Sequence, residues 1–212
     1  MFLTRVDLNG ARRAGRLLSS PRRVHGAVMA GFPEPPRGRV LWRLDRYGQR
    51  AALYVVSPDQ PDFRHLIEQV GWPTLHDTWR TVDYKSFLDR LSRDDIFRFR
   101  LEANPAHSAS RGPGLRGKQF GHVTVAQQAG WLLERGDRIG VRLGDADAPT
   151  FQVVGRDVKS FKRDGHVVTL ATAVFEGTLV VEDAERLRDA LVQGIGRGKA
   201  YGCGLLTLAR IS

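Results

Sequence analysis

Apolar and polar positions in the first part of the chain alternate or recur with the periods of short strands and helices. Residues 2–8 alternate, which predicts a strand. From Pro21 onward, Val24, Ala27 and Val28 recur at helical spacing, and a proline suits the first turn of a helix. The next segments predict a hairpin over residues 39–46 and 51–57, a short helix over residues 61–71, and an ambiguous strand or helix over residues 81–91.

A similar pattern starts again at residue 96. Residues 96–105 alternate as a strand, whereas residues 107–122 are polar, basic and rich in glycine, which predicts a mobile loop. The next segment predicts a helix over residues 124–136, capped by Thr124, with Val125, Ala129, Leu132 and Leu133 on one face. A hairpin over residues 151–181 is expected to turn at Asp164-Gly165. A helix over residues 183–194, opened by Asp183 and closed by Gly194, and a last strand over residues 204–211 complete the chain.

Each half of the chain therefore approximates the order strand, helix, hairpin, helix, strand. This is the βαββαβ order of the ferredoxin-like fold. A chain of 212 residues is long enough for two small domains. We expect an α+β protein with two tandem ferredoxin-like domains, residues 1–91 and residues 92–212.

The composition excludes several classes of protein. No apolar run approaches the roughly 20 residues of a membrane helix, and the first residues hold no apolar stretch typical of a signal peptide. Cys203 is the single cysteine, which excludes an internal disulfide and a cysteine-cluster zinc site. It lies between two glycines, which favours a small buried residue over a nucleophile. We expect a cytoplasmic protein with no cofactor, no bound metal and no membrane partner.

The positive charge is concentrated near the start of the chain. Residues 1–50 contain eleven Arg and three acidic residues, so they carry a formal charge of +8 of the total of +10. A basic cluster of this kind is a typical footprint for a polyanion such as nucleic acid. The alternative is codon usage in a GC-rich genome, because 28 of the 33 basic residues are Arg.

Residues 194–204, which we call the glycine-rich segment, contain five alternating or closely spaced glycines with Arg197 and Lys199. They do not match a Walker A loop, because three residues rather than four separate Gly194 from Gly198 and no Ser or Thr follows Lys199. A dinucleotide fingerprint is also excluded, since here a helix precedes the glycines and a strand follows. Two interpretations stay open: a backbone that approaches phosphates, or a tight connection packed on the neighbouring domain.

Several stretches in a fixed order resemble one known family. They are MFLTRVDL at the start, a histidine in the first predicted helix, FRLEANP at residues 99–105, AVFEGTLVVED at residues 173–183 and GIGRGKAYGCGLLTLA at residues 194–209. Together they resemble the CasE family, the CRISPR repeat-cleaving endoribonucleases of Cascade. The resemblance covers essentially the full chain. It implies tandem ferredoxin-like domains, an RNA-hairpin substrate, a glycine-rich segment near RNA phosphates, and other Cascade subunits as partners.

The resemblance also assigns catalytic candidates. In the family the active histidine falls in a first-helix segment of this form, and His25 is the match among the six histidines. Family members often carry a tyrosine three residues before it, where this chain has Arg22. An arginine can stabilise negative charge but cannot act as a base. Arg22 is therefore the candidate replacement for the tyrosine.

RNA binding is expected mainly from the second half. The predicted hairpin turn is basic, and the family inserts a basic hairpin into the groove of the repeat stem. The RNA-binding candidates are Arg23, Lys159, Lys162, Arg163, Gly196, Arg197, Gly198 and Lys199, together with Arg116 and Lys118 in the segment 107–122. Proteins recognise a short RNA stem through its shape and its phosphates more than through the edges of its bases.

The reaction implied by the resemblance is metal-independent cleavage, in which the 2′-OH of the RNA attacks the adjacent phosphorus and a cyclic phosphate forms. A histidine suits either proton transfer. The missing tyrosine leaves a second hypothesis, a non-catalytic RNA-hairpin-binding or assembly subunit. A third is a ferredoxin-like module of unrelated function whose charge reflects codon usage.

Overall fold

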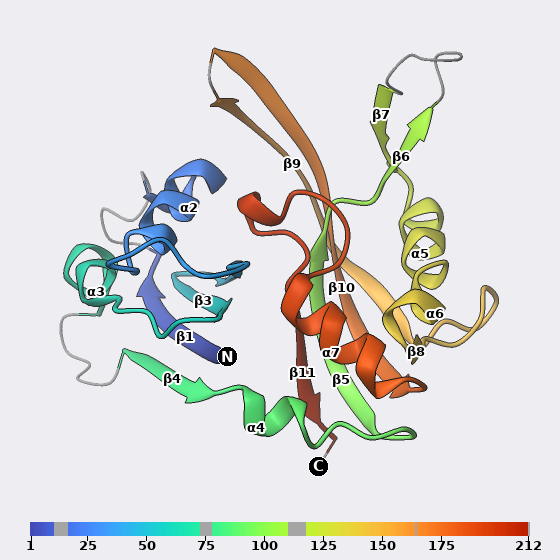
Figure 1. Cartoon of the computed structure of the whole chain (residues 1–212). Helices are drawn as coiled ribbons and strands as arrows, with labels where there is room; N and C mark the ends of the chain where they lie inside the picture. Colours follow the sequence, from blue (N-terminus) through green and yellow to red (C-terminus); the bar gives the residue numbers. More distant parts are fainter. Residues whose placement is uncertain (11–16, 73–77, 110–117, 164, 212) are drawn as a thin grey trace.

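The first half of the chain forms a four-stranded antiparallel sheet in the order β2-β3-β1-β4, with α2 and α3 connecting its strands (Figure 1). The computed structural model describes residues 1–10, 17–72, 78–109, 118–163 and 165–211. The elements are β1 (Phe2–Asn9), α2 (Pro21–Met29), β2 (Leu41–Tyr47), β3 (Arg50–Ser57), α3 (Arg64–Val70) and β4 (Trp79–Asp83), followed by α4 (Lys85–Leu88). This is the predicted βαββαβ order, with strands one and three in the centre.

The second half repeats this arrangement with additions. Its sheet has the order β11-β5-β10, with β9 paired along the outer side of β10 and β8 paired to the end of β10. The elements are β5 (Ile96–Ala103), β6 (Ala106–Ala109), β7 (Lys118–Gly121), α5 (Val125–Leu133), α6 (Gly136–Ile139), β8 (Val141–Arg142), β9 (Phe151–Arg163), β10 (His166–Val181), α7 (Ala184–Gln193), the 3-10 helix η1 (Lys199–Tyr201) and β11 (Leu206–Arg210). The prediction of two ferredoxin-like units is confirmed.

The segment 107–122 differs from the prediction of a mobile loop. Its two ends form strands β6 and β7, which pair from Ala106↔Gly121 to Ala109↔Lys118. The rings of His107 and His122 lie 4.9 Å apart at the base of this hairpin. Backbone pairing needs no apolar alternation, so a polar sequence gave no signal for these strands. Residues 110–117 lie outside the described part of the chain.

Helix α5 begins after Thr124 as predicted, and its capping box with Gln127 is present. The predicted buried face is wrong in part, because Val125 is 48% exposed. The buried side is formed by Gln128, Trp131 and Leu132. The ring of Trp131 stacks on Phe175 of β10, and this long-range contact sets the orientation of the helix. The ambiguous segment over residues 81–91 divides near Tyr84 into the end of β4 and the short helix α4.

A buried arginine of the first half, Arg43, joins the two halves. Arg43 of β2 is 1% exposed and pairs with Asp45 at 2.8 Å. The Arg43 guanidinium also donates to the carbonyl oxygens of Arg100 and Leu205 and to the hydroxyl of Thr207, in the second half. The larger hydrophobic core also contains residues from both halves, among them Leu41, Val56 and Phe175. Shared packing of this kind fixes the position of one sheet relative to the other.

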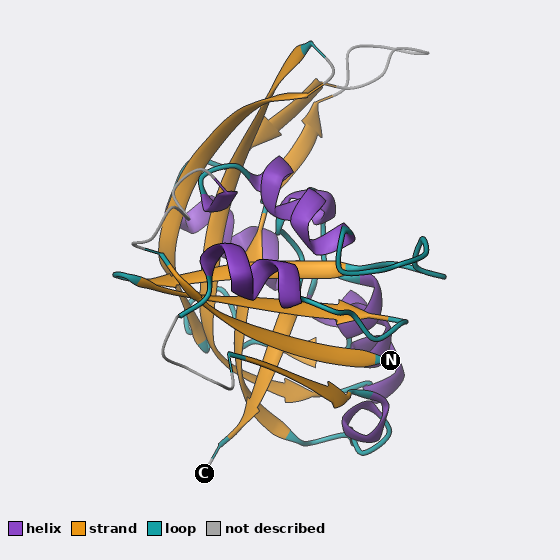
Figure 2. Ribbon diagram, turned by 90° about the vertical axis from the view of Figure 1, so that its left-hand side faces the viewer, coloured by secondary structure: helices purple, strands orange, loops and turns teal. Residues whose placement is uncertain are grey.

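The long hairpin of β9 and β10 projects beyond its own sheet at the top of the molecule, on the same end as α2 (Figures 1 and 2). Its strands are 13 and 16 residues long. Within the described residues, every helix is too short or too polar to cross a membrane. The projecting hairpin and α2 define the end of the molecule on which the candidate site lies.

Candidate functional site

Helix α2 presents a charged side while its apolar side is buried. Pro21 occupies the first turn, and Val24 and Val28 are 3% and 0% exposed. This periodicity leaves Arg22 and Arg23 exposed and His25 half-buried. The helix lies against η1 of the glycine-rich segment and against β9, both from the second half. The predicted catalytic residues are therefore placed on a surface that the second domain completes.

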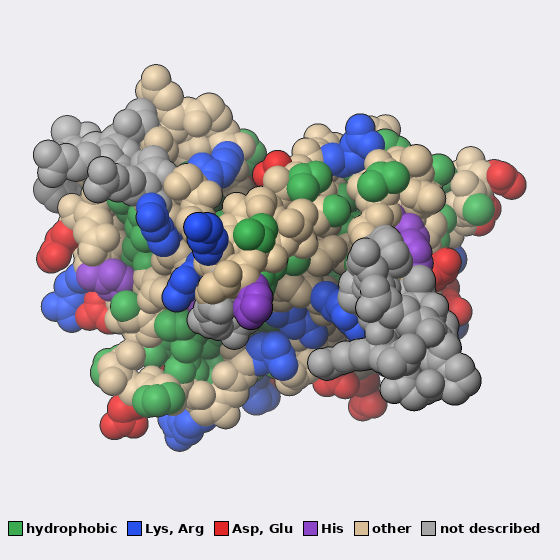
Figure 3. All heavy atoms as spheres, turned by 90° about the horizontal axis from the view of Figure 1, so that it is seen from above, with side chains coloured by type: hydrophobic (Ala, Val, Ile, Leu, Met, Phe, Trp, Pro, Cys, Tyr) green, Lys and Arg blue, Asp and Glu red, His purple; other side chains and the backbone are tan. Residues whose placement is uncertain are grey.

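A hydrogen bond connects α2 to the basic hairpin. The Nη1 atom of Arg22 donates to the carbonyl oxygen of Lys162, 3.3 Å away. The side chain of Lys162 is itself exposed. The structure thus joins two predicted site residues, Arg22 and Lys162, from distant parts of the chain, and His25 lies on the same helix as Arg22. Seen from above, Lys and Arg side chains gather in the middle of this face, with a histidine among them (Figure 3).

Lys159 occupies a different environment from Lys162. Its ammonium group forms an ion pair with Glu102 of β5, and the two side chains are only 25% and 10% exposed. A lysine that is paired and mostly buried is less available to RNA phosphates than an exposed one. The side chain of Arg163 at the end of β9 and that of Lys118 in β7 lie outside the described part, and so does all of Arg116.

The glycine-rich segment is tightly packed. Gly194, Gly196, Gly198, Gly202 and Gly204 all have positive φ, between 75° and 91°. A side chain at Gly202 would place its Cβ 2.7 Å from the ring of Trp42, and one at Gly196 would lie 3.0 Å from Trp131. The contact of Gly202 with Trp42 packs the segment on the first half, whereas the contact of Gly196 with Trp131 lies within the second half. They also hold Arg197 exposed and Lys199 half-buried at the edge of the segment.

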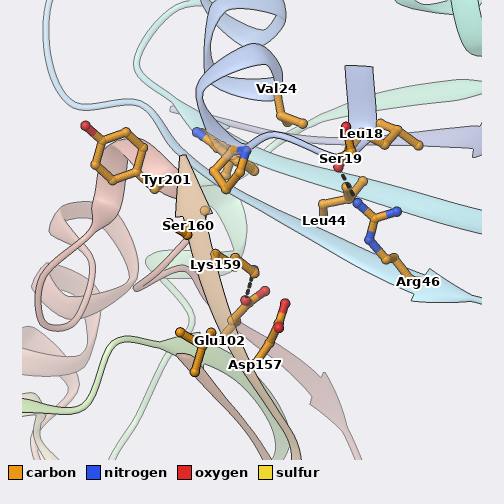
Figure 4. A pocket seen from close by; sticks show the side chains of 14 residues that line it. Leu18, Ser19, Val24, Leu44, Arg46, Glu102, Asp157, Lys159, Ser160 and Tyr201 are labelled. Atoms are coloured by element: carbon orange, nitrogen blue, oxygen red, sulfur yellow. Dashed lines mark hydrogen bonds and ion pairs between the residues drawn. The ribbon is translucent and has the colours of Figure 1, made fainter. Parts of the chain in front are cut away.

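A pocket of about 280 Å³ lies where α2, β9 and the glycine-rich segment meet (Figure 4). Lys159 and Glu102 face each other on one wall, while Arg46, on the other wall, donates to the carbonyl oxygen of Leu18. Tyr201 borders the pocket, and its ring lies 4.7 Å from that of Phe161 on the hairpin. The pocket is polar and contains both signs of charge.

Sequence reasoning missed three residues of this region, Tyr201, Arg46 and Glu102. Tyr201 is the one aromatic residue of the glycine-rich segment, and this was the available signal. Nothing in the sequence marked Arg46 or Glu102, since their partners lie 28 and 57 residues away. Among the described residues, no group of three or more His, Cys, Asp or Glu side chains is arranged to hold a metal ion.

Comparison with known proteins identifies the family. Residues 1–210 match the family described as "CRISPR associated protein". The CRISPR-associated endoribonuclease Cse3 of Thermus thermophilus is 32% identical, over 99% of this chain and 100% of that protein. The chain belongs to the CasE (Cse3) family of CRISPR-associated proteins. The Cascade subunit CasE of Escherichia coli is also 32% identical, over 79% of this chain and 94% of that protein.

Solved structures of the CasE family agree with this assignment. The structure of Thermus thermophilus Cse3 bound to an RNA representing a pre-cleavage complex has a TM-score of 0.79 and 30% identity, covering 98% of each chain. The resemblance to CasE inferred from the sequence is confirmed, and with it the tandem ferredoxin-like fold. In this CasE-family chain, α2, the β9–β10 hairpin and the glycine-rich segment converge at one end of the molecule.

Proposed function

We propose that this protein is an endoribonuclease that cuts the hairpin of CRISPR repeats in precursor RNA. The similarity to Cse3 over nearly the whole of both chains supports this activity. The observation that carries the proposal is the contact between the two parts such an enzyme needs. Helix α2, with His25, is held against the exposed basic hairpin through the hydrogen bond from Arg22 to Lys162.

The chemistry requires only groups of the protein and of the RNA. The 2′-OH next to the cut loses its proton and attacks the phosphorus, the bond to the 5′ oxygen breaks and that oxygen takes up a proton, and a 2′,3′-cyclic phosphate remains on the upstream product. His25 transfers a proton in this reaction, a role worth about 10²–10⁴-fold in rate. The Arg22 guanidinium stabilises the negative charge that develops on the phosphate oxygens. Because the nucleophile is part of the substrate, the proposed reaction needs no metal-bound water, and we propose that it is metal-independent.

In this proposal the two domains have different roles. Residues 1–91 carry the catalytic helix α2, and residues 92–212 bind the RNA. The RNA-gripping set comprises Lys159, Lys162, Arg163, Gly196, Arg197, Gly198, Lys199, Arg116 and Lys118, with Arg23 of the first domain beside them. Of these, Lys162, Arg197 and Arg23 are exposed, and so they are the strongest candidates for direct phosphate contacts. The Glu102 ion pair makes Lys159 the weakest.

We also propose that the protein stays on its product and acts as a Cascade subunit in the cytoplasm. The similarity to the Cascade subunit CasE of Escherichia coli supports this role. A second candidate function is an RNA-hairpin-binding subunit that does not cut. The presence of Arg22 at the position where family members often carry tyrosine favours this alternative.

A denaturing-gel cleavage assay on the host's repeat RNA tests the proposal. It compares the wild type with His25→Ala in excess EDTA, with a gel shift and a thermal unfolding curve on the same samples. We expect site-specific cutting by the wild type, no cutting by the variant, and binding by both. Tight binding without cutting by either protein would establish the non-catalytic alternative. Cutting that requires a divalent cation, or that persists in His25→Ala, would contradict the mechanism.

A further inference from the structure

A second hollow, of about 500 Å³, lies between the glycine-rich segment and helices α6 and α7. Its lining contains five basic side chains and one acidic side chain. The basic residues are Arg135, Arg138, Arg186, Arg197 and Lys199, and the acidic residue is Asp189. This excess of positive charge lies on the α6–α7 side of the segment, whereas α2 lies beside η1. We call it the basic hollow.

Two of the five basic residues are engaged within the protein. Arg186 pairs with Asp183 at 3.2 Å, and its guanidinium donates to the carbonyl oxygen of Asp137. Arg135 lies over the ring of Trp131 at 4.0 Å and donates to the carbonyl oxygen of that residue. These contacts hold two walls of the hollow in place. They also leave the remaining three cations as its distinguishing feature.

Arg138, Arg197 and Lys199 form no side-chain ion pair with any carboxylate of the described residues. These three cations outnumber Asp189, the one carboxylate in the lining, and they repel each other, so an anion bound here would lower the free energy of the protein. Burial, followed by the nearby charges of Arg39 and Arg138, lowers the pKa of Lys199. The charged form of Lys199 is therefore destabilised in the free protein. A negatively charged ligand in the hollow would stabilise this charged form.

We propose that the basic hollow binds the sugar-phosphate backbone of the single-stranded RNA that flanks the repeat hairpin. The inference rests on the proposed function, because it extends the path of the same RNA. Its volume of about 500 Å³ is in the range of pockets that hold one small ligand, so it fits a nucleotide of a single strand better than a duplex stem. Lys199 provides continuity, since it begins η1, which lies beside α2, and also lines the hollow. A strand leaving the hairpin near His25 would therefore cross the glycine-rich segment and enter the hollow.

Fluorescence anisotropy with three RNAs tests this inference. The RNAs are the host's repeat stem-loop without flanks, the same stem-loop with a short unpaired upstream flank, and the same stem-loop with a short unpaired downstream flank. The protein is the full chain carrying His25→Ala, so that cutting does not change the probe. We expect one of the two flanks to increase affinity above that of the stem-loop alone.

Two further substitutions, introduced into the chain that carries His25→Ala, should change the affinity for the flanked RNA in opposite directions. Arg138→Gln removes a cation from the hollow, and we expect the affinity for the flanked RNA to fall about threefold or more. The slope of log affinity against log salt should fall by about 0.7, the contribution of one phosphate contact on a single strand. Asp189→Asn removes the one acidic side chain of the hollow and should strengthen binding. Neither should change the affinity for the stem-loop alone, and both residues are exposed, so folding should be retained.

Arg93→Gln is the charge-matched control, because Arg93 is exposed in the connection before β5 and is absent from the lining of the hollow. The inference is overturned if neither flank adds affinity, or if Arg138→Gln weakens the stem-loop and the flanked RNA equally. These results would leave the proposed function intact. Failure of the starting protein to prefer the repeat stem-loop over an unrelated hairpin would instead overturn the proposed function itself.

Discussion

The Nη1 atom of Arg22 donates a hydrogen bond to the carbonyl oxygen of Lys162, at 3.3 Å and across 140 residues of sequence. One partner lies beside the candidate catalytic histidine and the other lies near the tip of the basic hairpin. The bond therefore couples the residue expected to stabilise charge to the element expected to grip the RNA. Both residues were predicted to be functional from the resemblance to the family, one in catalysis and one in RNA binding, and their contact is a structural link between these two roles.

Replacing Arg22 should slow cutting more than it weakens binding. We expect Arg22→Gln to reduce the single-turnover cleavage rate about 10²-fold, because charge stabilisation at the phosphate is lost. RNA affinity should change by less than about threefold. The neighbouring Arg23→Gln is the matched control and should affect affinity more than rate. Arg22→Tyr restores the residue common in the family and should recover activity. A wild-type rate in Arg22→Gln would remove Arg22 from the mechanism.

Lys162 should contribute to binding through phosphate charge. We expect Lys162→Gln to lower affinity for the repeat hairpin and to reduce the salt slope of log affinity by about 1, one contact fewer. Lys85→Gln is the control, since Lys85 lies on α4 and pairs with Asp89. Filter binding at several salt concentrations measures both slopes. Equal slopes for the two variants would place Lys162 outside the RNA interface.

The buried guanidinium of Arg43 should be essential to stability. In Arg43→Met the carboxylate of Asp45 keeps its ion pair with Arg100, at 3.1 Å, but loses its ion pair with the more buried Arg43. Removing one member of a buried ion pair costs about 3–5 kcal/mol. We expect the free energy of unfolding in urea to fall by about that amount. Arg64→Met, at a residue whose side chain is 81% exposed, should change it by less than about 1 kcal/mol. Similar effects in both variants would contradict the role of Arg43 in joining the halves.

Two glycine substitutions should change stability in opposite directions. Gly202 has a φ of 87°, and an added Cβ would lie 2.7 Å from the Trp42 ring, so Gly202→Ala should destabilise by about 2 kcal/mol or more. Gly130 lies within α5, where an added Cβ meets nothing within 4 Å. Gly130→Ala should therefore stabilise by about 0.5–1 kcal/mol. Thermal unfolding measures both, and a stabilising Gly202→Ala would show that the segment packs differently.

Cys203 should be chemically inert in the folded protein. The residue is 0% exposed, and burial raises the pKa of its thiol to about 12. Because the thiolate is the reactive form, a raised pKa leaves the neutral, unreactive thiol dominant near pH 8. We expect no alkylation by iodoacetamide in the native state and rapid alkylation in urea, followed by mass spectrometry. Rapid reaction of the native protein would show that the glycine-rich segment opens.

Sequence periodicity predicted most of the order of elements, both ferredoxin-like units, the helix that carries His25 and the basic hairpin, but it left residues 81–91 open between strand and helix. These features are local, because the period of apolar residues reports which face of a helix or strand is buried. The ordered set of short motifs along the chain was enough to predict the CasE family. The pairing of β6 with β7 was not predictable in this way, since hydrogen bonds between backbones leave no mark on a polar sequence.

Only the tertiary structure decided which charges meet. It paired Lys159 with Glu102 while leaving Lys162 exposed, although the two lysines are three residues apart on one strand. It also brought Arg138 close to Lys199 and so created the basic hollow. The physical reason is that a charge interacts with whatever the fold places within a few ångströms of it. Sequence fixes the sign of each charge, and long-range packing of the two sheets fixes its partners.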